Sequence, residues 1–310
     1  MGIQYDGLLQ LLKEKKISKT QLQKRLGISS TTIAKLAKNE PVSLKVIEDI
    51  CKELDCQPGD ILTMSKETSS NKLLNLLSEE KEMKLKGGLY HQTQVKFSYN
   101  SNHIEGSKLS EEQTRYIYET NTLALDEDET ASIDDIMETV NHFQCFDYIL
   151  DHAIDKLTED MIKACHGILK QNTSDSRRDW FRVGEYKSRP NTIGDRKTTP
   201  PAKVKYEMEK LLISYHNKKN ITIDDILEFH HWFEAIHPFQ DGNGRVGRLI
   251  MFKECLNHNI IPFIIDESHK LYYYRGLKEY ESEKGFLTET CLSTQDKYRE
   301  MMNYFIELES

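Results

Sequence analysis

The chain has 310 residues, a formal net charge of −8 at pH 7 and 38% hydrophobic residues. This length suggests two domains, or one large domain and one small domain. The longest apolar runs, such as residues 260–265, are much shorter than the ~18 residues that a membrane span needs, so we expect no membrane partner. Six scattered cysteines without a CxxC pair, and an N-terminus unlike a signal peptide, indicate a cytoplasmic protein.

The charge is unevenly distributed along the chain. Residues 1–40 contain seven lysines and Arg25 against three acidic residues, and the rest of the chain is acidic. Any contact with nucleic acid therefore belongs to the N-terminal part.

Helical spacing dominates nearly the whole sequence, which predicts an all-α protein. The exception is the segment 180–201, whose Arg, Gly, Pro and Thr residues favour an exposed β-hairpin or flap. A polar Ser/Thr-rich stretch indicates a linker between a small first domain and a larger second one. We predict the boundaries 1–62 for the first domain, 63–71 for the linker, 72–120 and 121–280 for the second domain, and 281–310 for a C-terminal helical extension.

The segment "SKTQLQKRLGISSTTIAKLAKNE" predicts two short helices with "GIS" between them. Gly27 can take the left-handed turn without steric cost. The segment resembles the Cro/C1-type helix-turn-helix family over residues 5–62, although Gln23 stands where that family usually has a small Ala. The resemblance implies DNA binding, and the alternative is a small helical interaction module. Outward residues on the second helix suit a major groove: Ser30, Thr31, Thr32, Lys35 and Lys38.

The stretch "HPFQDGNGRVGR", residues 237–248, concentrates groups suited to phosphate chemistry. Glycines and a helix start near Gly244 favour an anion site made of backbone amides. Asp241 can hold Mg²⁺, and His237 can accept a proton near neutral pH. Arg245 and Arg248 can bind further phosphates. The chain has no GxxxxGK[ST] motif, so this is not a P-loop nucleotide site.

This stretch matches the Fic family motif, HPFx(D/E)GNGRxxR, at every specified position, and the resemblance extends over about residues 72–280. It implies an all-α Fic core, with residues 72–120 as its N-terminal helices and 121–280 as the catalytic core. It also implies transfer of AMP from MgATP to a hydroxyl side chain of a target protein. By position, His237 would be the general base and Asp241 the Mg²⁺ ligand. Phosphates would be bound by Gly242, Asn243, Gly244, Arg245 and Arg248.

Two further segments correspond in position to parts of the Fic fold. The predicted flap at 185–194 would hold a target segment by strand addition, through Tyr186, Lys187, Ser188, Thr192, Ile193 and Gly194. We also consider Tyr186 as a site of self-modification. Tyr273 and Tyr274 are candidates for stacking near adenine, and core packing explains their spacing equally well.

The stretch "SNHIEG", residues 101–106, places Ser101 and Glu105 on one face of a helix that ends at Gly106. It fits the Fic inhibitory pattern (S/T)xxxE(G/N), in the form that precedes the catalytic core. The resemblance implies that Glu105 pairs with Arg248 and misaligns the phosphates of ATP.

The favoured interpretation is an autoinhibited Fic adenylyltransferase with a DNA-binding head and an unknown target protein. Two alternatives remain open: a Fic enzyme that removes AMP, and a transcriptional regulator whose Fic site senses nucleotide. Self-association into a homo-oligomer is compatible with the sequence.

Overall fold

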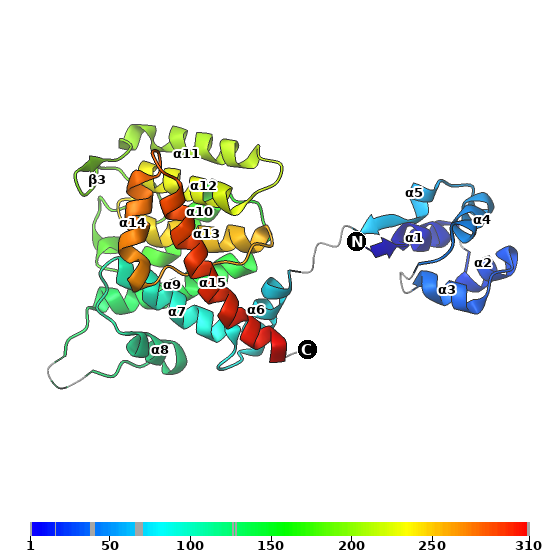
Figure 1. Cartoon of the computed structure of the whole chain (residues 1–310), viewed down its shortest axis with the longest axis horizontal. Helices are drawn as coiled ribbons and strands as arrows, with labels where there is room; N and C mark the ends of the chain where they lie inside the picture. The colour runs from blue at the N-terminus through cyan, green and yellow to red at the C-terminus, as the bar shows by residue number, and fades with distance from the viewer. Residues whose placement is uncertain are drawn as a thin grey trace. The chain divides into compact units, whose positions relative to one another are not determined.

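The computed structural model describes residues 2–15, 17–37, 41–65, 71–125, 127 and 129–308. The chain divides into two compact units, Met1–Ser70 and Asn71–Ser310 (Figure 1). Both units are mostly helical, and the second contains a small β-hairpin. The predicted all-α class with a hairpin is therefore confirmed.

The first unit consists of five helices and two short strands in its described part. Its core contains Leu22, Leu36, Ile47 and Ile50. The strands pair antiparallel, with Ile3 opposite Met64. The elements are β1 (Gly2–Gln4), α1 (Asp6–Glu14), α2 (Lys19–Leu26), α3 (Ser30–Ala37), α4 (Leu44–Leu54), α5 (Pro58–Ile61) and β2 (Thr63–Ser65).

Local sequence sets the start and the end of α2. Ser18 and Gln21 form a capping box, in which each side chain accepts a hydrogen bond from the other residue's backbone N–H. Gly27 ends the helix in the left-handed region, with φ of 63°, as the sequence predicts. Residues 63–65, assigned to the linker from sequence, form β2, and residues 66–70 of that linker lie outside the described residues.

The second unit is a helical assembly around α13. Its helices are α6 (Lys72–Met83), α7 (Leu89–Ile104), α8 (Glu111–Thr120), α9 (Ile133–Asp151), α10 (Glu159–Lys170), α11 (Pro201–His216), α12 (Ile223–Ile236), α13 (Asn243–Asn257), α14 (Lys270–Glu279) and α15 (Gly285–Leu308). Short 3₁₀ turns lie at η1 (Asp175–Arg177) and η2 (Glu267–His269), and the hairpin consists of β3 (Thr192–Ile193) and β4 (Arg196–Lys197).

The helix α13 packs against α7, α9, α10 and α12 (Figure 1). The residues from Asn243 to Leu256 are buried almost without interruption, including both arginines of its first turns. Buried charges must be paired, so the surrounding helices have to supply acceptors for these arginines. This requirement organises the site described below.

All six cysteines are free thiols. Among the described residues, no helix combines the length and the apolar character required to cross a membrane.

Candidate active site

Buried contacts fix the loop between α12 and α13. Phe239 is fully buried and stacks on His166, with ring centroids 4.0 Å apart. Asn243 accepts a hydrogen bond from the Phe239 N–H at 2.8 Å and donates one to the Phe239 carbonyl at 3.0 Å. His237 ends α12 in the left-handed region, with φ of 53°. The loop therefore presents His237 and the start of α13 in a fixed relation.

The helix α13 begins at Asn243, one residue before the predicted start, with Gly242 as its N-cap at φ of 79°. A Cβ added to Gly242 would lie 3.2 Å from Cδ2 of Leu169, so a side chain there would be both strained and crowded. The first amides of a helix have no partner within the helix, and together with the helix dipole they favour an anion.

His237 lies beside this helix start and its side chain is 19% exposed. Burial, together with the positive charge of Lys187, lowers the pKa of His237 to about 4. The imidazole is therefore neutral near pH 7 and able to accept a proton. Its Nδ1 lies 3.9 Å from Oε2 of Glu234, whose pKa is raised to about 8 by burial and by the nearby Glu105.

Arg248 is held by the C-terminal end of α7. Its Nε donates to Ser101 Oγ at 3.0 Å, and its terminal NH2 donates to the Ser101 carbonyl at 2.9 Å and to Glu105 Oε1 at 2.7 Å. The Arg248 side chain is 3% exposed, whereas that of Glu105 is 31% exposed. The sequence-predicted residues Ser101, Glu105 and Arg248 are thus brought together.

The carboxylate of Glu105 also lies against the first turn of α13. A Cβ added to Gly244 would come 2.2 Å from Glu105 Oε1. The carboxylate therefore packs directly over Gly244, where the helix start and Arg248 together favour negative charge.

Arg245 points to a different set of acceptors from Arg248. Its terminal nitrogens donate to Glu138, to Asp241 at 3.2 Å and to Asn102 at 3.5 Å. Its side chain is 4% exposed. A role of Arg245 on phosphate would require release from these acceptors, so the structure places it as a partner of Asp241.

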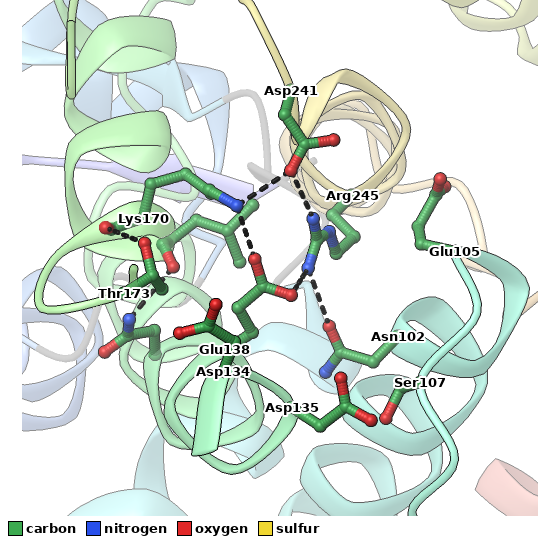
Figure 2. A network of polar contacts seen from close by, with 12 residues as sticks. Asn102, Glu105, Ser107, Asp134, Asp135, Glu138, Lys170, Thr173, Asp241 and Arg245 are labelled. Atoms are coloured by element: carbon green, nitrogen blue, oxygen red, sulfur yellow. Dashed lines mark hydrogen bonds and ion pairs between the residues drawn. The ribbon is translucent and has the colours of Figure 1, made fainter. Parts of the chain in front are cut away.

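Asp241 is the one predicted metal ligand. Its side chain is 52% exposed, and Lys170 and Arg245 both contact its Oδ2 (Figure 2). Burial opposes ionisation, but these two cations hold the pKa of Asp241 below its ordinary value. The described residues contain no group of three or more His, Cys, Asp or Glu side chains that could hold a metal ion. A single accessible carboxylate fits Mg²⁺, which is often bound through one or two carboxylates together with substrate phosphates.

The hairpin begins later than the predicted flap. Thr192 and Ile193 pair with Lys197 and Arg196, and all four are exposed. Gly194 follows in the turn at φ of 55°. Ser188 is exposed outside the hairpin, and its hydroxyl donates to the Trp180 carbonyl.

The prediction that Tyr186 and Lys187 belong to an exposed flap is wrong. Lys187 is 4% exposed, and its ammonium donates to Asn191, Thr198 and the Ile236 carbonyl. The Tyr186 hydroxyl is buried, so it is not accessible for self-modification. Lys187 fixes the segment through these hydrogen bonds, and the ring of Tyr186 packs against Phe239.

A cavity of about 700 Å³ lies between the hairpin, α12 and α14. Tyr274 lines it and is 41% exposed, and its hydroxyl donates to the Ile104 carbonyl at 3.2 Å. Tyr273 is fully buried, with its hydroxyl 2.6 Å from His230 Nε2. The prediction that Tyr273 stacks on adenine is therefore wrong, and Tyr273 belongs to the core. Successive helical residues point in different directions, which separates these neighbours.

The loop lies in a segment that is similar to a known protein family. Residues 156–255 match the Fic/DOC family, and residues 8–67 match the Cro/C1-type helix-turn-helix DNA-binding domain. The first match contains the whole loop, from His237 to Arg248. The chain carries a Fic/DOC domain. An N-terminal helix-turn-helix domain precedes it.

The Fic domain is distantly homologous to protein adenylyltransferases. "Protein adenylyltransferase Fic" of Drosophila melanogaster is 29% identical over 186 residues, which cover 58% of this chain and 36% of that protein. The protein of the same name from Nematostella vectensis is 28% identical over 193 residues, covering 58% and 42% respectively. The chain therefore spans less than half of the length of these curated relatives.

Solved structures share the same fold. A Fic-domain-containing signaling protein from Bacteroides thetaiotaomicron aligns with a TM-score of 0.57 at 27% identity, covering 76% of this chain and 88% of that one. Fic-1 of C. elegans aligns with a TM-score of 0.57 at 16% identity, covering 94% and 98%.

Sequence reasoning missed four polar residues of the Fic site. Glu138 and Lys170 contact the motif from α9 and α10, Asn191 donates to the Phe239 carbonyl, and Glu234 lies near His237. Glu234 stands three residues before His237, so its helical spacing was the one available signal. The other three have partners that are distant in sequence.

In the helix-turn-helix domain, Thr31 and Lys35 are exposed on α3. Thr32 is half-buried and its hydroxyl lies 2.9 Å from that of Ser29. The side chain of Ser30 and the whole of Lys38 lie outside the described residues.

Proposed function

We propose that the chain is an autoinhibited protein adenylyltransferase that transfers AMP from MgATP to a hydroxyl side chain of a target protein. The observation that carries this proposal is a neutral His237 beside the start of α13, together with the pairing of Glu105 and Arg248 at the same site. Distant homology of the Fic domain to protein adenylyltransferases supports the same reaction class.

In this reaction the oxygen of the target hydroxyl attacks the α-phosphorus of ATP. A new P–O bond forms, the bond to the β-phosphate oxygen breaks, and pyrophosphate leaves. His237 accepts the proton of the attacking hydroxyl. The amides at Gly242, Asn243 and Gly244 and the start of α13 stabilise the phosphate charge. Asp241 would hold Mg²⁺, which neutralises phosphate charge when bound.

Inhibition follows from the position of Glu105. Its carboxylate lies over Gly244 and pairs with Arg248. It therefore fills the space that a distal phosphate needs and neutralises the positive charge that would bind this phosphate. Arg248 is buried, and leaving a buried cation without its carboxylate partner costs about 2–5 kcal/mol in measured interfaces. ATP phosphates that bind beside an intact pair are misaligned for in-line attack.

The hairpin is the proposed docking strand for the target. Thr198 N–H contacts the Asn191 carbonyl at 3.5 Å, and Ile193 and Arg196 flank the turn. Hydrogen-bonded and non-bonded pairs alternate along an antiparallel ladder, so the backbone groups of Thr192 and Lys197 point outward. An extended target segment can pair with such an edge with little demand on its sequence. The adenine would occupy the neighbouring cavity, in contact with Tyr274.

The experiment that tests the proposal follows α-labelled ATP into protein in the presence of Mg²⁺. Three full-length chains are compared: the wild type, Glu105→Gly, and Glu105→Gly combined with His237→Ala. We expect strong self-labelling in the single variant, weak labelling in the wild type and none in the double variant.

Equal thermal stability of the double and single variants would show that the loss of label is chemical. An unlabelled Glu105→Gly chain that still binds ATP would contradict self-adenylylation. Release of AMP from a pre-labelled protein by the wild type would instead support the AMP-removing alternative.

A further inference from the structure

Four charged side chains from four segments form a closed ring beside the loop (Figure 2). Lys170, at the end of α10, lies 2.5 Å from Glu138 Oε1 and 2.7 Å from Asp241 Oδ2. Arg245 closes the ring by contacting Glu138 Oε2 through one terminal nitrogen and Asp241 Oδ2 through the other at 3.2 Å. Positive and negative groups alternate around the ring, so each member has two opposite neighbours.

Lys170 is buried within the ring, and all of its charged partners are carboxylates. The Lys170 side chain is 2% exposed, and its ammonium also lies 2.8 Å from Asp175 Oδ2. Lysines are almost never fully buried unless they are paired, because an unpaired buried ammonium loses its hydration without compensation. Three carboxylates from α9, η1 and the loop therefore fix the position of this ammonium.

The ring constrains one oxygen of Asp241 and leaves the other outside it. Both cations contact Oδ2, and the second oxygen of Asp241 points away from the network in Figure 2. A carboxylate held at one oxygen cannot rotate freely, so the direction of its remaining lone pairs is set in advance. Preorganisation of this kind is what partners of a metal ligand normally provide.

We propose that Lys170, together with Glu138, is a positioning residue for the divalent metal ion of the nucleotide. The ring holds Asp241 through Oδ2 so that Oδ1 is directed to the metal. This inference rests on the proposed function, because it assumes that a metal–nucleotide complex binds at the loop. Lys170 touches neither the nucleotide nor the reacting atoms in this role.

The test measures metal binding instead of activity. Mn²⁺ is titrated by electron paramagnetic resonance into the full-length Glu105→Gly chain saturated with α,β-methylene ATP, which does not transfer AMP. Nucleotide affinity is measured separately in EDTA. Lys170→Met should raise the Kd for Mn²⁺ about tenfold or more, in the range of partner mutations at metal ligands, with the metal-free nucleotide Kd within about twofold.

Lys253→Met is the matched control. Lys253 is also buried and paired with a carboxylate, Glu254 at 2.7 Å, but it contacts no member of the ring in the described structure. Its substitution should leave Mn²⁺ affinity unchanged. If Lys170→Met does not fold, Glu138→Gln provides the same readout, since it keeps the side-chain shape and removes the charge that links the two cations.

Asp241→Asn separates the two levels of the proposal. If Asp241→Asn weakens Mn²⁺ binding while a folded Lys170→Met or Glu138→Gln chain binds Mn²⁺ like its parent, the positioning role is refuted and the metal site stands. If Asp241→Asn has no effect on Mn²⁺ binding, the metal role of Asp241 fails, and this inference fails with it.

Discussion

Arg248 receives most of its support from two residues one helical turn apart, Ser101 near the end of α7 and Glu105 directly after it. Ser101 accepts hydrogen bonds through its hydroxyl and its carbonyl, and Glu105 accepts one through its carboxylate. The hydroxyl contact fixes the guanidinium plane, and the carboxylate then meets it at 2.7 Å. We therefore expect Ser101 to take part in the proposed inhibition through the orientation of Arg248.

Replacing Ser101 with Ala should weaken inhibition without removing it. The buried Nε–H of Arg248 would lose its acceptor, and an unsatisfied buried donor costs about 1–3 kcal/mol. We expect self-labelling by Ser101→Ala to exceed that of the wild type by roughly 5-fold or more and to stay below that of Glu105→Gly. Labelling of Ser101→Ala at the wild-type level would show that the hydroxyl has no part in holding Arg248.

The sequence predicted residues that interact locally, and a family motif predicted the distant pair of Glu105 and Arg248. Other residues whose partners lie far along the chain were missed. The loop from His237 to Arg248 carries its own turn and helix start, so its geometry followed from spacing. Lys170 and Glu138 stand in ordinary amphipathic helices, and only the packing of α9 and α10 against α13 brings Lys170 to Asp241 and Glu138 to Arg245. The burial of Lys187 and Tyr273 likewise depends on tertiary packing that periodicity does not encode.

At the scale of elements, α9 and α10 each bury a histidine beside cations of the site. His142 and His166 are fully buried. Burial lowers the pKa of His142 to about 3, with further lowering by Arg248, and burial with Lys170 lowers the pKa of His166 to about 3. Both rings are therefore neutral in the folded protein over the physiological range.

These helices make the second unit sensitive to acid. An unfolded histidine binds a proton below about pH 6.5, whereas the folded rings do so only near pH 3. The contribution of these neutral histidines to the free energy of unfolding is fully present above pH 6.5 and is lost as pH falls, by about 2 kcal/mol per histidine at pH 5.

His142→Leu should reduce the loss of unfolding free energy between pH 7.5 and pH 5 by about 2 kcal/mol. Neither ring nitrogen of His142 has a hydrogen-bond partner among the described residues, so an apolar replacement is tolerated. Urea unfolding followed by tryptophan fluorescence provides the measurement, because both tryptophans, Trp180 and Trp232, lie in the second unit. An unchanged pH dependence would contradict a neutral buried His142.

At the scale of the whole molecule, the two units have separate hydrophobic cores. The helix-turn-helix domain has its own hydrophobic cluster around Leu22 and Ile50, and the Fic unit has a different one around α13. Residues 1–40 carry a net positive charge, and the rest of the chain is acidic. DNA binding and nucleotide chemistry are therefore expected to be separable.

Full-length protein should bind random duplex DNA with an affinity that falls steeply with salt. Lys35→Ala should reduce the slope of log K against log salt by about 0.9, which corresponds to one lost phosphate contact. Lys52→Ala on α4 is the control, since Lys52 is exposed and paired with Glu48. Fluorescence anisotropy at four salt concentrations measures both slopes, and equal slopes for Lys35→Ala and the wild type would exclude Lys35 from the interface.

The end of α7 contacts both arginines of the motif through adjacent residues. Ser101 accepts a hydrogen bond from Arg248. Asn102 accepts one from Arg245, which in turn contacts Asp241 (Figure 2). A displacement of this helix end that frees Arg248 also removes an acceptor next to Asp241, the proposed metal ligand. If such a displacement changes the affinity for metal by some factor, bound metal changes the equilibrium constant of the displacement by the same factor. Under the proposed function, we expect the concentration of divalent metal to shift the equilibrium between the paired and the released states of Arg248.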